Sequence, residues 1–344
     1  MSTLSLSLAG RWQSRLSRSG LLLLAALLLA GSLLLDIASG PAQLSISQVL
    51  HSLLQGEGGD GVIVWQIRLP VALMALAVGA ALGVSGLIMQ TVLHNPLACS
   101  YTLGISAGAG FGAALFIVAG SSLGLAEAWG LPLSALGFAF VAGSAVLLIG
   151  RRRGGNAESY VLAGIALLFL FQALLSLLQY LASPDALAQI VFWLFGSLYK
   201  SGWHAVGLMW LTLLLGVGLL ARDAWRFTAL GLSDERAASL GIAVARLRWR
   251  ALALVSLLTG VAVAFVGTIG FVGLIAPHMA RMLLGEDHRL LIPGAALSGA
   301  LLLSLASVLG KWLSPGGLIP IGIVTALIGL PFFLLLILRS KGGQ

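Results

Sequence analysis

Side chains that could carry covalent or metal chemistry are few in this sequence, and their spacing matches no familiar motif. No Walker A, HExxH, GxSxG or Cys/His metal-ligand pattern occurs. The single cysteine, Cys99, can form neither an intrachain disulfide nor a zinc site alone. The strings GEGGDG at 56–61 and GAGFG at 108–112 lack the flanking residues of phosphate-binding loops, and we interpret them as a turn and as part of an apolar run. We therefore expect no catalytic residue, no bound metal and no cofactor on this chain.

Ionisable side chains beside apolar runs are the stronger candidates, because burying a charge in a membrane is costly and usually has a purpose. His278 and Arg281 lie close to Pro277, and we expect them to pair with backbone carbonyls rather than bind a metal. Arg68 and Lys311 lie at the ends of long apolar runs. There they either snorkel to the interface or dock a partner.

The composition places these residues in a polytopic membrane protein. Of the 344 residues, 59% are hydrophobic and 9% charged, against about 25% charged in an ordinary soluble domain. The mean hydropathy is +1.05. A net charge of +8 could indicate nucleic-acid binding. The basic residues, however, occupy short loops between apolar runs, so we expect no nucleic-acid partner.

Apolar runs of spanning length predict an all-α fold with about ten transmembrane helices. Residues 21–35 resemble a signal peptide, but the many runs downstream favour an uncleaved first span. The expected helices cover 19–35, 69–93, 101–120, 131–150, 159–182, 203–221, 251–270, 274–285, 290–313 and 320–338. Fifteen of the 19 Lys and Arg residues then fall on one side, in segments 11–18, 151–153, 222–250, 289 and 339–341. This asymmetry predicts that both termini face the cytoplasm.

The stretch from Arg68 to Gly112 organises the chain. Its first apolar run meets a polar break at Asn95-Pro96, where proline disfavours helix in the residue before it, and Leu97 follows. Such a break is tolerated in a membrane only where protein or a water-filled path covers it, so we expect a cytoplasmic gate there. The second run carries small residues at four-residue spacing, which let another helix approach closely; these are Gly104, Gly108 and Gly112.

An internal repeat is also indicated. Four positions recur after a shift of 181 residues: Gly79, Gly86, Pro96 and Gly104 as Gly260, Gly267, Pro277 and Gly285. The first copy starts outside and the second inside, which predicts an inverted repeat with halves of about 69–182 and 251–338 in one permease domain, 1–344. We expect the glycines at 79, 86, 260 and 267 to pack helices together.

The charged inner segment 222–250 contains the string LSDERAASLGI. It predicts a short helix capped by Ser233, with acids at its positive end and a glycine stop. A loop helix that orients two spans and a knob for a cytoplasmic partner explain this pattern equally well. The residues concerned are Ser233, Asp234, Glu235, Arg236, Ala237, Ala238, Leu240 and Gly241.

Several long strings resemble the FecCD-type family, the permeases of ABC importers for ferric siderophores, haem and vitamin B12. They are RLPVALMALAVGAAL, SGLIMQTVLHNPLA, YTLGISAGA, ALGLSDERAASLGI, WLFGSL, GFVGLIAPHMARMLLGEDHRLLIPGAALSGA and PIGIVTALIGLPFF. The resemblance implies that 222–250 is a cytoplasmic coupling loop for an ATPase, and that Arg68 and Lys311 meet acidic residues of a binding protein. It also implies a path at a dimer axis, lined by the fifth and tenth helices and the short segment before WLFGSL.

The chain departs from the family pattern on its outer side. Val71 replaces a second basic residue after Arg-Leu-Pro, Ser307 and Lys311 stand where Asp and Arg are frequent, and Leu318 replaces an acid. Cys99-Ser100 follows Asn-Pro-Leu-Ala in place of an acid or small residue and Pro. These differences concern the docking surface.

The resemblance implies an inner-membrane permease subunit of a bacterial ABC importer for a chelated iron compound, a ferric siderophore first and haem or cobalamin next. Its partners would be membrane lipid, a second permease copy in a homodimer, two cytoplasmic ATPases that hold ATP and Mg, and a periplasmic or lipid-anchored binding protein. The alternative is an ion-gradient-driven secondary transporter, which needs buried acids. The 11 acids fall in loops or at span ends, with Asp36 and Glu158 nearest the membrane, which argues against it.

Overall fold

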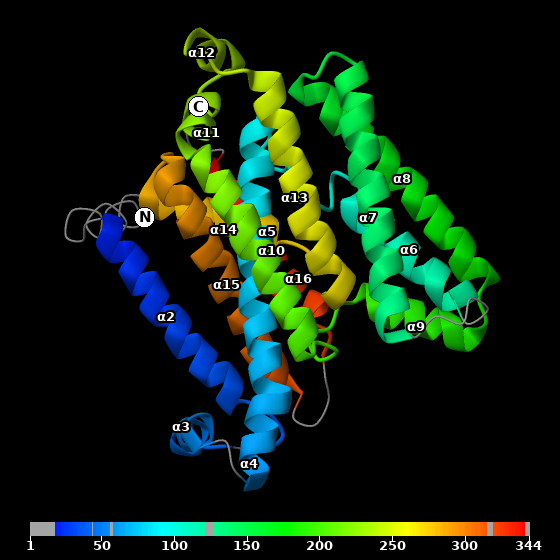
Figure 1. Cartoon of the computed structure of the whole chain (residues 1–344), viewed down its shortest axis with the longest axis vertical. Helices are drawn as coiled ribbons and strands as arrows, with labels where there is room; N and C mark the ends of the chain where they lie inside the picture. The colour runs from blue at the N-terminus through cyan, green and yellow to red at the C-terminus, as the bar shows by residue number, and fades with distance from the viewer. Residues whose placement is uncertain (1–17, 43, 56–57, 121–126, 315–318, 341–344) are drawn as a thin grey trace.

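The computed structural model describes residues 18–42, 44–55, 58–120, 127–314 and 319–340. Arg11, Arg15, Lys341 and Leu318, which the sequence analysis used, lie outside these ranges. The described residues form an all-α bundle, as expected (Figure 1). Its helices are α2 (Arg18–Ala38), α3 (Ile46–Gln55), α4 (Gly58–Val62), α5 (Leu69–Val92), α6 (Ile105–Ala119), α7 (Glu127–Arg152), α8 (Ala157–Leu181), α9 (Pro184–Leu194), α10 (Trp203–Arg222), α11 (Ala224–Leu230), α12 (Asp234–Ser239), α13 (Val244–Val266), α14 (Val272–Leu284), α15 (His288–Leu313) and α16 (Ile321–Ser340), with a π-helical turn, η1 (Ile63–Arg68), between α4 and α5.

Each of the ten expected spans has a helix. By length and composition, seven described helical stretches could cross a membrane: α2, α4 to α5 as one rod, α7, α8, α10, α13 and α15. The apolar helices α6, α9 and α14 are shorter. One expectation was wrong, because Gly58–Val62 is helical rather than a turn and extends the rod of α5 outward.

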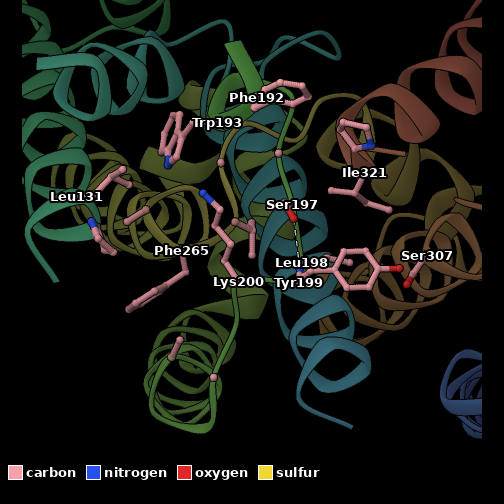
Figure 2. A pocket seen from close by; sticks show the side chains of 18 of the residues that line it. Leu131, Phe192, Trp193, Ser197, Leu198, Tyr199, Lys200, Phe265, Ser307 and Ile321 are labelled. Carbon is pink, nitrogen blue, oxygen red and sulfur yellow. Dashed lines mark hydrogen bonds between the residues drawn. The ribbon is translucent and has the colours of Figure 1, made fainter. Parts of the chain in front are cut away.

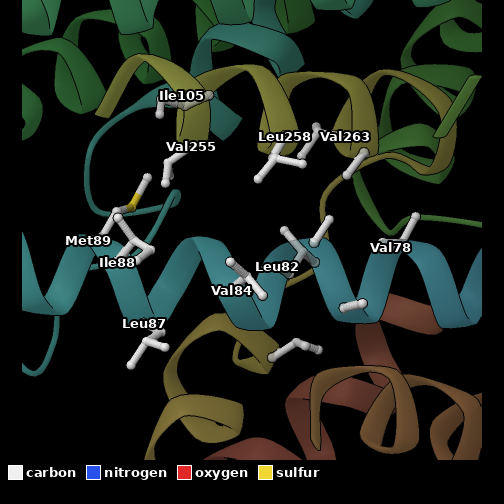
Figure 3. Packing of buried hydrophobic residues seen from close by; sticks show 14 of the residues in the cluster. Val78, Leu82, Val84, Leu87, Ile88, Met89, Ile105, Val255, Leu258 and Val263 are labelled. Carbon is white, nitrogen blue, oxygen red and sulfur yellow. The ribbon is translucent and has the colours of Figure 1, made fainter. Parts of the chain in front are cut away.

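Helix α5 is the core of the bundle, and 94% of its most apolar window is buried. It lies between α13, α14 and α15 in Figure 1, and Figure 3 shows Leu82 and Met89 of α5 on the side facing Leu258 and Val255 of α13. A helix buried all round must be apolar all round, and this explains why its apolar residues show no single face.

Glycine residues, which have no side chain, let the neighbouring helices α14 and α15 approach α5 closely. A Cβ added at Gly79 would lie 2.3 Å from the carbonyl oxygen of Gly299 in α15, and one at Gly86 would lie 1.8 Å from that of Gly273 in α14. No real Cβ occupies such positions, so these contacts require glycine.

The other expected packing glycines fall into three cases. A Cβ at Gly108 or Gly112 would lie within 2.8 Å of the carbonyl oxygen of Phe138 or Ser134 in α7. Gly260 has only ordinary contacts with α7. Gly104 and Gly267 flank helices with positive φ angles of 74° and 75°, which favour glycine. They begin α6 and end α13. A Cβ at Gly104 would also lie 2.8 Å from the backbone nitrogen of Leu168, and one at Gly267 would lie 2.3 Å from the carbonyl oxygen of Trp193.

The two ends of the bundle carry different short helices. At one end, α11 and α12 project beside the start of α13 and the end of α5, and we call this the inner end because the charge pattern predicts it to be cytoplasmic (Figure 1). The opposite, outer end carries α3 and α4. Helix α5 runs inward and α13 outward, so the long-helix, break, short-helix pattern recurs with opposite direction.

The proposed register of that repeat was wrong. Pro96 lies in the irregular segment between α5 and α6, whereas Pro277 lies inside helix α14. The break in the second copy is the turn Gly267–Phe271. A shift of 181 residues therefore does not superpose the two breaks.

Candidate functional site

A cavity of about 750 Å³ opens at the outer end of the bundle. The ends of α7, α9, α10, α13, α15 and α16 form its wall, together with the loop 195–202 (Figure 2). Its lining is rich in aromatic rings and contains few charges. The aromatic residues are Trp129, Phe192, Trp193, Tyr199 and Phe265, and the polar ones include Ser197, Lys200, His204 and Ser307.

Backbone hydrogen bonds fix the inner wall of this cavity. Gly196 takes a positive φ of 74° after α9, which turns the chain sharply. The next N–H, of Ser197, donates to the carbonyl of Val266 at 2.8 Å, and the N–H of Gly322 donates to that of Phe195 at 3.0 Å. The loop is thereby joined to the end of α13 and the start of α16.

Tyr199 contributes a neutral hydroxyl to the cavity. Burial, and next the nearby Asp36 carboxylate, raise the pKa of Tyr199 to about 12, although Arg68 acts in the opposite direction. The phenol therefore keeps its proton at physiological pH and can donate a hydrogen bond. Its ring points toward Ser307 (Figure 2).

Arg68 is not the exposed charge that we expected. Its side chain is buried, and its guanidinium donates hydrogen bonds to the carbonyl oxygens of Ile37 and Ala38, both at 2.8 Å, and to that of Ala42. These carbonyls belong to the last turn of α2 and the chain just beyond it, where no intrahelical N–H remains to satisfy them. A cation there also faces the negative end of the helix. Arg68 thus caps α2 from outside.

Lys311 is buried as well. Its Nζ lies 2.7 Å from Asp36 Oδ1 and 2.7 Å from the Asp36 carbonyl oxygen, and Ser307 Oγ donates to the same carboxylate at 2.8 Å. The side chains of Asp36 and Lys311 are 0% and 5% exposed. Arg68 and Lys311 are therefore not free surface charges in this chain, and their role in docking a binding protein stays a prediction. Both anchor α2 to the bundle.

The segment that joins α5 to α6 lies at the inner end. Its side chains at Pro96 and Leu97 are exposed, and Leu97 is 50% exposed. Asn95 closes the turn, because its Oδ1 accepts a hydrogen bond from the N–H of Leu97 at 2.9 Å. Cys99 is buried just beyond. The structure places these residues on a surface where another subunit could cover them, and their gate role stays a prediction.

The expected short helix is α12. Ser233 Oγ accepts a hydrogen bond from the N–H of Arg236 at 3.2 Å, and Gly241 follows with a φ of 79°. Ala238 and Leu240 are exposed, with Leu240 at 61%. Ala237, which we expected beside Ala238 on the small face that a cytoplasmic partner would contact, is instead fully buried.

Asp234 is the most connected residue of this helix, and the sequence analysis missed its partners. Both of its carboxylate oxygens accept hydrogen bonds from Arg248 Nη2, at 2.8 and 2.9 Å, and Oδ1 also lies 2.9 Å from His94 Nε2. Partial burial alone would raise the pKa of Asp234. The hydrogen bonds and charges of Arg248 and His94 outweigh that effect and lower it, so the carboxyl is ionised at neutral pH.

Within the part of the chain that the structure describes, His278 and Arg281 contact side chains and not the backbone carbonyls that we expected. Arg281 donates to Gln90 Oε1 of α5 and lies 3.4 Å from Glu286, and the His278 ring packs edge-on against Phe332. Both join α14 to its neighbours. Among the described residues, no group of three or more His, Cys, Asp or Glu side chains could hold a metal ion.

The fold and these two regions define a multi-pass α-helical membrane transport protein. Comparison with known proteins makes the class specific: residues 24–339 match the model of the FecCD transport family, and the chain belongs to this family of ABC transporter permeases. It is 39% identical to the hemin transport system permease protein HmuU of Yersinia pestis, over 96% of this chain and 98% of that protein. It is 36% identical to the molybdate import system permease protein MolB of Haemophilus influenzae, over 92% and 95%.

The fold agrees with that assignment. A solved metal-chelate type ABC transporter in an inward-facing conformation superposes with a TM-score of 0.82 at 35% identity, covering 94% of this chain and all of that one. The vitamin B12 import permease BtuC of Citrobacter koseri is 38% identical over 81% of this chain and 84% of its own. The relatives are thus named for different cargoes.

Proposed function

We propose that this permease is the membrane subunit of a binding-protein-dependent importer in a bacterial inner membrane, and that it moves a chelated iron compound driven by ATP hydrolysis on a separate ATPase. The proposal rests on what lies at the inner end of the bundle. There α12 projects with Ala238 and Leu240 exposed, on a chain whose sequence holds no nucleotide-binding motif. A transport subunit without a motor needs such a contact.

The outer cavity supports an organic chelate as the cargo. Its volume of about 750 Å³ lies in the range of pockets that hold drug-sized molecules. Aromatic walls with few charges offer contact area without strong binding, which suits a path that must release its cargo. A ferric siderophore is the favoured cargo, with haem and cobalamin next, since relatives are named for iron chelatin, haemin and vitamin B12.

The assembly that follows has two copies of this chain, two ATPases that bind ATP and Mg, and one binding protein, periplasmic or lipid-anchored. The path would lie at the axis between the copies. The exposed segment Asn95–Leu97 would border its cytoplasmic gate, and residues 233–241 would contact the ATPase.

A secondary transporter driven by an ion gradient is the second candidate, because it would use an acid buried beside a span. Among the described residues, Asp36 and Asp223 are buried at the ends of spans, and Asp223 is paired with Arg226 and Arg250. Asp36 is fully buried, as a coupling acid would be. It is, however, held by Lys311 and Ser307 at the outer end of α2, and its contacts account for it as a structural anchor.

Uptake by proteoliposomes tests the proposal. The permease is reconstituted with its ATPase and its binding protein, and uptake of a ferric siderophore, haem, cobalamin and molybdate is compared. We expect uptake that needs ATP and all three proteins and is greatest for the siderophore. Molybdate uptake in place of siderophore uptake would refute the proposal that the cargo is a chelated iron compound. Gradient-driven uptake by the permease alone would refute the proposal that it is a subunit of an ATP-driven importer.

A further inference from the structure

Arg248 is a buried hub at the inner end of the bundle. It lies near the start of α13, and its side chain is 2% exposed. Its Nε donates to the carbonyl of Val92 at 2.7 Å and its Nη1 to that of Gly155 at 2.9 Å. Its Nη2 holds both oxygens of Asp234. One guanidinium thereby joins the last residue of α5, the turn between α7 and α8, and the first residue of α12.

The geometry of this hub requires arginine. Each of the three guanidinium nitrogens has an acceptor in a different direction, and a planar fork with five N–H donors can satisfy all of them at once. A lysine ammonium could keep the charge, but not this set of contacts. Val92 is the last residue of α5, and Gly155 lies in the turn between α7 and α8. Their carbonyls form a base from which the guanidinium faces Asp234.

Asp234 reaches beyond the hub to the break between α5 and α6. Its Oδ1 accepts a hydrogen bond from His94 Nε2 at 2.9 Å. His94 directly precedes Asn95-Pro96 and has a φ of 47°, a left-handed conformation that non-glycine residues seldom adopt. A strained residue persists only where its surroundings hold it, and strain of this kind gathers at parts that switch.

Few other contacts could carry a movement between these segments. Within the described part of the chain, the hydrogen bonds of α12 to residues outside 222–250 are those between Asp234 and His94. Ala237 also packs into the bundle, but an apolar contact can slide, whereas an ion pair fixes both distance and direction.

We propose that Asp234, oriented by Arg248, is the positioning residue that transmits movement of α12 to the break at His94–Leu97. When the ATPase displaces α12, the carboxylate pulls or releases His94 and so alters the turn that Asn95 closes. This inference rests on the proposed function and adds to it the side chains through which hydrolysis reaches the gate.

The test uses Asp234→Asn in the complete transporter, reconstituted with its ATPase and binding protein. The variant keeps the size and one acceptor oxygen of Asp234 but loses the charge. We expect the amount of cargo moved per ATP hydrolysed to fall about tenfold, which is the usual size of a coupling between sites. In the unsubstituted transporter we expect the labelling rate of Cys99, the single thiol, to differ with and without a non-hydrolysable ATP analogue. In Asp234→Asn we expect this difference to be lost.

Glu158→Gln is the matched control, because Glu158 is an exposed acid in the first turn of α8. Cargo per ATP should not change in it. The proposal is overturned if Asp234→Asn moves as much cargo per ATP as the unsubstituted protein. It is also overturned if Glu158→Gln lowers cargo per ATP as much as Asp234→Asn does.

A second pair of variants decides the matter should Asp234→Asn fail to assemble. His94 lies at the surface, with its side chain 34% exposed, so its replacement disturbs no buried packing. His94→Ala must lower cargo per ATP and weaken the nucleotide effect on Cys99, and His94→Gln, which keeps a donor, must restore part of both. Unchanged coupling in His94→Ala refutes the proposal. Absence of ATP-driven uptake in the unsubstituted complex would instead refute the proposed function.

Discussion

Replacing Lys311 with methionine separates two roles of a cation at this position: stabilising the fold by pairing with Asp36, and docking the binding protein. The side chain of Lys311 is 5% exposed and pairs at 2.7 Å with a carboxylate that is 0% exposed. Methionine fills nearly the same volume without a charge. Asp36 would then keep Ser307 as its hydrogen-bond donor and lose its counter-ion, and Oδ2 already has no hydrogen-bond partner among the described residues.

Breaking one side of a buried pair costs more than removing the whole pair, because it leaves an uncompensated charge. The expected loss in the free energy of unfolding is about 3–5 kcal/mol for Lys311→Met. Asp36→Leu with Lys311→Met should recover most of that loss, since the two replacements remove both charges. For a chain of this size the single variant should lower Tm by roughly 5 °C or more.

The assay is thermal unfolding of the purified permease in mild detergent, followed by tryptophan fluorescence, with binding-protein affinity measured in parallel. Lys200→Met is the control, because Lys200 is an exposed outer lysine for which the described structure shows no ion pair. Its Tm should not change. If Lys311→Met keeps its Tm and instead loses affinity for the binding protein, then Lys311 is a docking residue and the argument from burial is wrong.

Three further outcomes are expected. Gly86→Leu should prevent folding or lower Tm strongly, because a Cβ there would lie 1.8 Å from a carbonyl oxygen, whereas Gly137→Leu, which faces open space, should not; equal Tm values would contradict the packing. Ala238→Trp should leave the subunit inserted but abolish co-purification of the ATPase, and retention of the ATPase would mean that α12 is only a loop helix. The lowered pKa of Asp234 means that its ionised form stabilises the protein above about pH 4 and that this contribution is lost as the pH falls through the lowered value. The Tm difference between the unsubstituted protein and Asp234→Asn should thus shrink as the pH falls below about 4 and the carboxyl takes up its proton.

The fold could be predicted from the sequence because its cause is local. A run of some twenty apolar residues must be helical in a membrane, since every backbone group needs a partner within the segment. The expected helix at 69–93 differs from α5 by one residue at its end, and the expected cap at Ser233 is present. Features that depend on one turn of chain, such as a cap or a glycine stop, are likewise visible in the sequence.

The partners of the charged side chains could not be predicted, because they are set by contacts between distant segments. Asp36 and Lys311 are separated by 275 residues, and each alone is consistent with a loop or interface charge. The repeat failed for a related reason. Matching prolines suggested matching breaks, but a proline can also lie inside a membrane helix whose neighbours satisfy the freed carbonyl, as Pro277 does in α14.

For Arg248, the sequence nevertheless contained a signal that its side chain is buried and paired. The string RLRWR was interpreted as a group of positive-inside residues. Arg246 and Arg250 are four residues apart on one helix face and are exposed, whereas Arg248 shares its face with Leu252 and Val255, which are buried. A charge on the apolar stripe of a helix must have partners, so the periodicity of α13 alone separates the hub from its two solvated neighbours. Which acceptors Arg248 uses, the carbonyls of Val92 and Gly155, could be learned only from the fold. That it needs acceptors could be predicted from the sequence. The same test, applied to each charge in an inner loop, distinguishes cations that set topology from those that hold the moving parts together.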